Sequence, residues 1–191
     1  MKSIINKTLI LLITLMINVP SHSRTVIGVE GMVIEDSSVF KGYIGHGIIE
    51  NLDLNIFIGL DSYSEKYPGN TKNKYQIEVY GLGLKYNFVN NFYTNLLLFN
   101  SNVKLEQNND IIGNEIARDH APWIGAEIGY RYQILDDLQL KIVYGLSSPI
   151  KDIDIQLSGA SSECNGTTRG RFCINKFEFQ GQLRLGVAYL F

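Results

Sequence analysis

Histidine, the side chain best suited to acid–base catalysis near neutral pH, is scarce in this sequence. The chain has three histidines, and only His46 and His120 lie beyond residue 24. Asp119 directly precedes His120, but adjacent residues of an extended chain point to opposite faces. We therefore interpret this pair as loop residues beside Pro122. We expect a protein that is not an enzyme and that uses no cofactor or metal.

The chain has two cysteines, Cys164 and Cys173. In a protein exported to an oxidising compartment, two cysteines this close together favour a disulfide. Closing so small a loop contributes somewhat under ~3 kcal/mol, so we predict a bond that shapes a local loop. A metal or catalytic thiol pair is the alternative, but no histidine lies nearby.

Seven charged side chains fall within or beside stretches of alternating apolar residues. They are of both signs, so an enclosed set could neutralise itself as a network. The candidates are Glu30, Lys85, Glu127, Arg131, Lys141, Glu178 and Arg184.

The first residues predict export. Lys2 and Lys7 precede an almost wholly apolar run over residues 9–19, and Ser21 and Ser23 precede Arg24 with the small-x-small spacing of a cleavage site. The run is too short to span a bilayer as a helix, which needs about 20 apolar residues. We predict a cleaved signal peptide over residues 1–23 and one mature domain over 24–191. A retained anchor is the alternative.

The mature chain has the charge and composition of a strand-rich protein. Cleavage removes two lysines and no acid, which leaves 15 basic against 19 acidic residues and a net charge of −4. No basic patch that would suggest nucleic acid is evident. The mean hydropathy is zero, which excludes a bundle of membrane helices.

Residues 177–191 alternate strictly. Apolar and aromatic side chains occupy every second position up to Phe191, and polar or small residues occupy most of the others. Because successive strand residues point to opposite faces, one face is apolar and the other polar. In a membrane barrel the apolar face meets lipid, and aromatic residues mark the two interfaces.

The same alternation recurs upstream. It is clear over residues 54–61, 80–88, 124–134 and 138–147, and poorer over 25–35, 40–50 and 92–105. Short links at 51–53, 89–91 and 135–137 alternate with longer ones at 62–74, 106–120 and 151–172, although the first link of the longer set, 36–39, is short. Short turns at one end and longer loops at the other are typical of outer-membrane barrels. We predict an all-β fold, an eight-stranded antiparallel up-and-down transmembrane barrel.

The closing segment, residues 186–191, resembles the end of many outer-membrane proteins. Tyr189 and Phe191 match the signal read by the outer-membrane assembly machinery, which the resemblance implies as a partner. With the signal peptide and eight candidate strands, the chain resembles the small outer-membrane barrels of Gram-negative bacteria: the OmpA transmembrane domain, the OmpX and Ail type, and opacity proteins.

This resemblance implies a monomer in contact with outer-membrane lipid and lipopolysaccharide. We expect a barrel whose loops serve adhesion, host-factor binding or envelope integrity. The loop residues suited to a partner are Tyr63, Tyr67, Arg118, Arg169, Arg171 and Phe172.

A small pore is the alternative function, and a lipid-acting enzyme is a weaker one. The pattern of lipid A deacylases, a His and a Ser two residues apart near the end, does not occur, nor does the Asp-x-His pair of omptin-type proteases. A palmitoyltransferase-like activity would have to involve His120. The interior charges could gate a pore or form a permanent plug, and we favour the plug because eight strands leave little lumen.

Overall fold

The fold is known from a computed structural model that describes residues 24–34, 37–67, 71–88, 91–109, 113–157, 166–168 and 171–191. The predicted signal peptide and its alternative, a retained anchor, lie outside the described residues. No helix among those described is long and apolar enough to cross a membrane.

Eight strands close into one antiparallel barrel in which each strand pairs with the next and the last pairs with the first. This confirms the predicted fold class and strand count. The barrel strands are β1 (Thr25–Ile34), β2 (Ser37–Ile49), β3 (Leu52–Tyr67), β4 (Thr71–Asn87), β5 (Phe92–Asn109), β6 (Gly113–Gln133), β7 (Leu138–Pro149) and β11 (Gln180–Leu190).

A belt of exposed apolar side chains surrounds the barrel. It includes Ile58 (68% exposed), Leu96 (64%) and Leu185 (63%), each pointing away from the lumen. At one end, Tyr189 and Phe191 are also exposed, with ring centroids 4.8 Å apart. An apolar belt with an aromatic edge is the surface that a barrel presents to lipid.

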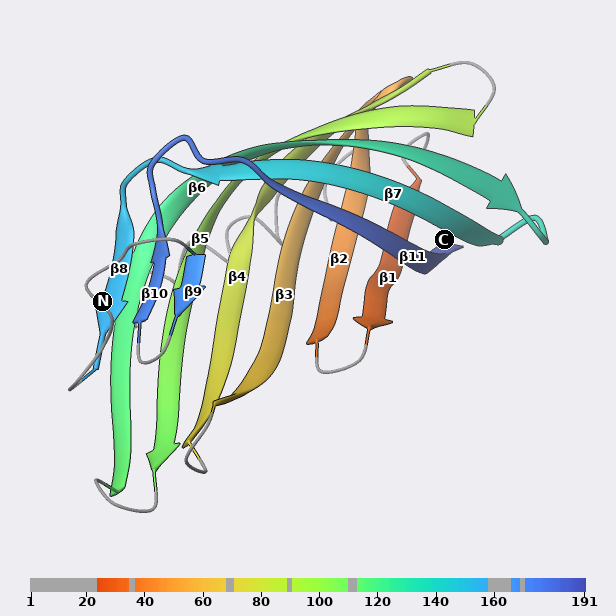
Figure 1. The fold of residues 1–191 in the computed structure, drawn as a ribbon. Helices are drawn as coiled ribbons and strands as arrows, with labels where there is room; N and C mark the ends of the chain where they lie inside the picture. The colour runs from red at the N-terminus through yellow and green to blue at the C-terminus, as the bar shows by residue number, and fades with distance from the viewer. Residues whose placement is uncertain are drawn as a thin grey trace, which may run out of the picture.

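The barrel wall is uneven in height. Strands β3 to β6 have 16 to 21 residues, whereas β1, β2, β7 and β11 have 10 to 13. The longer strands extend well past the others, toward the lower left of Figure 1. Because barrels of this kind carry their longer connections on the outer side, we call the part of β3 to β6 beyond the lipid belt the extracellular wall. The expected long loops at 62–74 and 106–120 are therefore wrong, because most of these residues continue the strands.

The expected loop at 151–172 is also only partly a loop. It carries a three-stranded sheet of β8 (Ile153–Gln156), β9 (Gly166–Thr168) and β10 (Arg171–Ile174), in the order β8-β10-β9. This small sheet lies against the inner side of the extracellular wall (Figure 1). The two share a hydrophobic core of Tyr75, Val103, Leu105, Ala121, Trp123, Ile153, Ile155, Phe172 and Ile174.

This core explains why the sequence pattern predicts loops for residues that form the extracellular wall. Within the lipid belt, apolar residues of β5 such as Leu96 and Leu98 point outward. Higher on the same strand, Val103 and Leu105 are buried and point inward, toward the small sheet. The alternation continues along the strand, but the apolar residues take the outward positions within the lipid belt and the inward positions above it.

Candidate functional sites: the barrel interior and the extracellular wall

Glu127 on β6 is the centre of a charge network inside the barrel. Its buried carboxylate accepts a hydrogen bond from Lys41 at 2.6 Å, one from Asn95 at 2.9 Å and one from Arg184. The Arg184 guanidinium also donates to Glu30, with 3.2 Å between Nε and Oε2. These residues come from β1, β2, β5, β6 and β11, so the network ties strands from all sides of the barrel together.

A second cluster lies nearer the end with short turns. The Lys85 ammonium is 2.5 Å from a carboxylate oxygen of Asp53. Asn87 donates to Asp53 at 3.1 Å, and its side-chain oxygen accepts from Arg131, also at 3.1 Å. The cluster thereby joins β3, β4 and β6.

Aromatic rings fill the space between the charged groups. Lys141 donates to the Tyr43 hydroxyl, and its Nζ lies 4.6 Å from the centre of the Tyr43 ring and 5.5 Å from that of Tyr93. Cation–π contacts of this kind stabilise a buried ammonium. Gly28 and Gly129 make room for the rings, since a Cβ there would lie 2.3 Å from Tyr43 and 2.2 Å from Tyr93.

The structure places six of the seven predicted charges in the interior: Glu30, Lys85, Glu127, Arg131, Lys141 and Arg184. Glu178 is the exception. It is exposed, precedes β11 and accepts a hydrogen bond from the Asn175 backbone at 3.1 Å. The prediction fails here because the alternation over 177–191 begins before the strand does.

Sequence reasoning missed Lys41 and Asp53. Lys41 lies on β2, where the alternation is poor because small residues occupy several positions of the strand. The sequence places Asp53 in a tight link, yet it lies on β3, where it meets Lys85.

Within the described part of the chain, side chains separate a cavity of about 420 Å³ on the extracellular side from one of about 770 Å³ that opens at the opposite end. Between them, the central charges and rings leave a space of about 10 Å³, which is room for a single water. This arrangement matches a plug rather than an open channel.

The small sheet closes over part of the extracellular cavity. Phe172 and Ile174 of β10 line it, and the Phe172 ring centre is 5.7 Å from that of Tyr75. Arg171 holds β10 to β8 by donating to Asp154 at 2.9 Å and 2.8 Å. These hydrogen bonds lower the pKa of the Asp154 carboxyl.

Several predicted loop residues belong to this region. Cys173 is buried on β10, but Cys164 lies outside the described residues, so the disulfide stays a prediction. Tyr63 stacks on Tyr75 on the inner side of the wall, with their ring centroids 4.4 Å apart. Arg169 and the Tyr67 side chain lie outside the described part of the chain.

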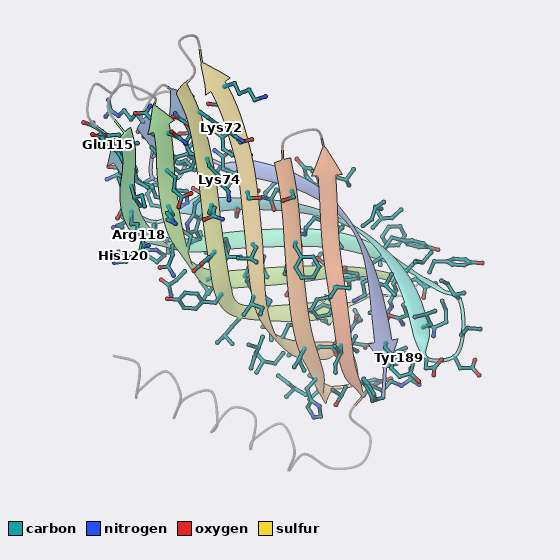
Figure 2. The ribbon with its side chains drawn as sticks, turned by 90° about the horizontal axis from the view of Figure 1, so that it is seen from below. Lys72, Lys74, Glu115, Arg118, His120 and Tyr189 are labelled. Atoms are coloured by element: carbon teal, nitrogen blue, oxygen red, sulfur yellow. The ribbon has the colours of Figure 1, made fainter. Side chains whose placement is uncertain are left out.

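The outer surface of the extracellular wall carries an excess of positive charge. We call this surface the basic face. Outward positions of four adjacent strands contribute to it, and Figure 2 shows Lys72 and Lys74 on β4 with Arg118 and His120 on β6. Its charged residues are the cations Lys66, Lys72, Lys74, Lys104 and Arg118 and the acids Glu78 and Glu106.

Strand register places like charges directly opposite one another on this face. Lys66 pairs with Lys72 across β3 and β4, and Lys104 pairs with Arg118 across β5 and β6. Such pairs are destabilising. The hydrogen bond from Lys104, with the positive charges of Lys104, Lys74 and Arg118, lowers the pKa of Glu106. The sequence offered no sign of this face, because its residues are scattered over four segments.

Asp119 and His120 are strand residues of β6, not the expected loop pair. Asp119 is partly buried and contacts Lys151 at 3.2 Å, whereas His120 is exposed on the outer surface, so the two point to opposite sides as alternation requires. Among the described residues, no group of three or more His, Cys, Asp or Glu side chains could hold a metal ion.

The closed antiparallel barrel, its outward apolar belt and its charged interior together define a small outer-membrane β-barrel. The protein is therefore an integral protein of the bacterial outer membrane. The first and last barrel strands also meet at the point where the Phe191 backbone N–H donates a hydrogen bond to the Thr25 carbonyl at 2.9 Å.

Solved structures of other outer-membrane proteins share this fold. A major outer membrane protein of Thermus thermophilus has a TM-score of 0.65 at 10% identity, covering 90% of this chain and 100% of that one. Ail of Yersinia pestis, in complex with the heparin analogue sucrose octasulfate, has a TM-score of 0.52 at 10% identity, covering 88% and 97%. Neisserial surface protein A has 0.51 at 13% identity, covering 90% and 98%.

At these identities the likeness shows the fold alone. No family model matches the sequence, and no curated protein matches it.

Proposed function

We propose that this protein is a surface-interaction barrel whose basic face binds sulfated or similarly polyanionic polysaccharides, as an adhesin does. The observation that carries the proposal is the strand register that sets like charges opposite each other, Lys66 opposite Lys72 and Lys104 opposite Arg118. Each costs stability in the free protein. A bound polyanion would relieve both, because its charges would lie between the paired cations.

The height of the face favours a polysaccharide over a lipid phosphate. Tyr80 is the last large apolar side chain of the belt on β4, and Lys74 is six residues further up the strand. At about 3.3 Å per residue, this is roughly 20 Å along the strand. A partner that reaches Lys74 and Lys72 must therefore extend well beyond the lipid surface.

A structural neighbour lends support of a general kind. Ail, which has the same fold, was crystallised with a heparin analogue. The plugged lumen supports the proposal in another way, because it leaves the exterior as the surface available to a partner.

The test is heparin binding by the folded barrel in lipid nanodiscs without lipopolysaccharide. The variant Lys72→Gln/Lys74→Gln should bind about tenfold more weakly, since each exposed ionic contact contributes under about 1 kcal/mol. The matched control is Lys151→Gln/Lys176→Gln, which removes the same charge from exposed positions off the basic face. It should bind as the wild type does. An equal loss in both variants would overturn the proposal.

A second arm separates the two sources of anionic groups. The same titration is repeated in bilayers that contain lipopolysaccharide. If lipopolysaccharide abolishes heparin binding at every heparin concentration, the face serves the protein's own membrane instead. If heparin still binds with an unchanged preference for the wild type over Lys72→Gln/Lys74→Gln, the partner is an external polysaccharide.

A further inference from the structure

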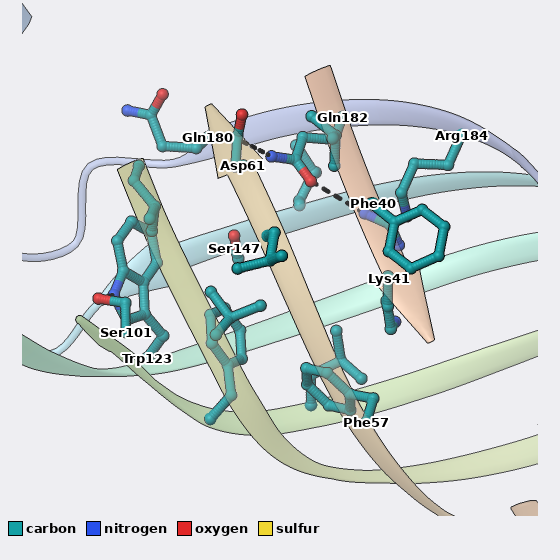
Figure 3. Close-up of a pocket in the computed structure, with 18 of the residues that line it drawn as sticks. Phe40, Lys41, Phe57, Asp61, Ser101, Trp123, Ser147, Gln180, Gln182 and Arg184 are labelled. Carbon is teal, nitrogen blue, oxygen red and sulfur yellow. Dashed lines mark hydrogen bonds between the residues drawn. The ribbon is translucent and has the colours of Figure 1, made fainter. Parts of the chain in front are cut away.

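The extracellular cavity has both apolar and charged side chains in its lining. Phe57, Leu97, Phe99 and Trp123 supply apolar surface, and Lys41, Glu127 and Arg184 supply charges. Figure 3 shows Lys41 and Arg184 on one side of the cavity and Trp123 on the other. A volume of about 420 Å³ falls within the range of small-molecule sites. Nothing in the proposed polysaccharide binding uses this space.

The barrel wall beside the cavity is incompletely paired. Strands β1 and β11 pair only from Val26↔Leu190 to Gly31↔Leu185. Beyond this point β1 continues along β2, and residues 180–184 of β11 continue along β7. Within the described residues, this five-residue edge of β11 has no strand partner on its β1 side. It spans roughly 16 Å.

Exposed apolar side chains flank the unpaired edge: Leu185 (63% exposed) precedes its lower end and Phe179 (70% exposed) follows its upper end. Because apolar residues of the outer surface face lipid, we infer that the edge lies at the depth of the outer leaflet. Phe40, Leu60 and Leu146 are exposed on the lipid side of the barrel, and all three also line the cavity. The cavity therefore continues through the seam to the lipid.

Polar groups line the same opening. Backbone groups of an unpaired strand edge need hydrogen-bond partners in hydrocarbon. Gln182 bridges the gap by donating to Asp61 on β3 at 3.4 Å and accepting from Arg184 at 3.0 Å (Figure 3). An occupant of the opening thus meets both an apolar cavity and a hydrogen-bonding rim.

The charged residues of the lining determine which head group an amphiphile in this cavity can carry. Lys41 and Arg184 are held in ion pairs by Glu127 and, for Arg184, Glu30. Asp61 takes part in no ion pair within the described residues. With Glu178 at the rim, the ionisable residues of the lining carry a net charge of −1. This favours an ammonium group near Asp61 and disfavours an anionic head.

We propose that this cavity binds the hydrocarbon chain of an amphiphile whose head carries an ammonium group and no net negative charge, and that this amphiphile enters from the outer leaflet between β1 and β11. The chain packs among Phe57, Leu97 and Phe99, and the ammonium group contacts Asp61 at the rim. The site is independent of the basic face, which lies on the outside of the wall.

Trp123 is the only tryptophan in the chain and lines the cavity, so it reports occupancy directly. The refolded barrel, checked by its heat-dependent gel shift, is titrated in detergent with lysophosphatidylethanolamine whose chain is brominated. Bromine atoms that enter the cavity quench Trp123. We expect saturable quenching, and Ser147→Phe, which fills the cavity, should raise the half-saturating concentration at least tenfold. The control Leu140→Phe, on the lipid face of the same strand, should change nothing.

The head group is tested in the same assay. Brominated lysophosphatidylglycerol, which is anionic, should bind several-fold more weakly than the ethanolamine probe, and Asp61→Asn should remove this difference. Quenching that is linear in probe concentration and unaffected by Ser147→Phe would overturn the proposal, because the chain would then only sample the outer surface. Equal binding of both head groups by the wild type would overturn the role of Asp61.

Discussion

The barrel interior and the basic face each contain five cationic side chains, but the positive charges are compensated differently in the two regions. Inside, Lys41, Lys85, Arg131, Lys141 and Arg184 share their space with the carboxylates of Glu30, Asp53 and Glu127 and with several aromatic rings. On the basic face, five cations meet only two acids, and register places cations opposite one another.

The difference follows from solvation. A buried charge without a partner costs several kcal/mol, so each interior cation needs a carboxylate, a neutral hydrogen-bonding group or an aromatic ring beside it if the barrel is to fold. Water screens an exposed charge, so the basic face tolerates its excess at a small cost. Interior charges therefore serve the structure, and the unbalanced charges outside are the ones available to a partner.

The largest expected effect is that of Glu127→Gln in the interior. This change keeps the shape of the side chain but leaves Lys41 and Arg184 facing a neutral group. Removing one partner of a buried ion pair typically costs about 3–5 kcal/mol. Urea unfolding of the barrel in vesicles, followed by Trp123 fluorescence, measures the loss. The control Glu78→Gln, on the basic face, should change the free energy of unfolding by under about 0.5 kcal/mol. A similar change in the free energy of unfolding for both variants would contradict the difference drawn between the interior and the basic face.

A smaller effect, of opposite sign, is expected for Arg118→Glu. It replaces a like-charge pair with Lys104 by an opposite-charge pair, which should stabilise the barrel by roughly 0.2–1 kcal/mol. Polysaccharide affinity should fall in the same variant, because the face loses two units of positive charge. A variant that loses stability and keeps its heparin affinity would show that the face is structural.

The smallest effect concerns pH. The contact with Lys104 lowers the pKa of Glu106 from its ordinary 4.5, so the interaction persists through the usual range of glutamate and is lost only as the pH falls through the lowered pKa. At that point the face loses a negative charge, and heparin affinity should rise. The titration is done in a Glu78→Gln/His120→Gln background, so that neither the other acid of the basic face nor this imidazole contributes. In Glu106→Gln the rise should disappear, and a rise centred above pH 4.5 would contradict the assignment.

The barrel was predictable from the sequence because every second residue of a membrane strand faces lipid and must be apolar. That rule identified β11, β7 and the lower halves of β3, β4 and β6. It failed for the extracellular wall, where Tyr75, Val103 and Leu105 turn inward to pack on the small sheet.

The interior charges were largely predictable for the same reason, since Glu127, Lys141 and Arg184 occupy the inward positions that alternate with outward apolar ones. The basic face was not, because only the register between strands brings Lys104 and Arg118 together. Neither could the open seam between β1 and β11 be foreseen, as it depends on where pairing stops rather than on any residue type.

The central claim is that the lumen is closed and that the outer surface carries the function. Its most direct test is single-channel conductance of the refolded barrel in a planar bilayer. Folding is first confirmed by the heat-dependent gel shift. We predict an electrically silent wild type, because the central charges and rings leave room for a single water. Reproducible discrete openings in the wild type would contradict the account, since the interior charges would then form a gate and the function would be transport.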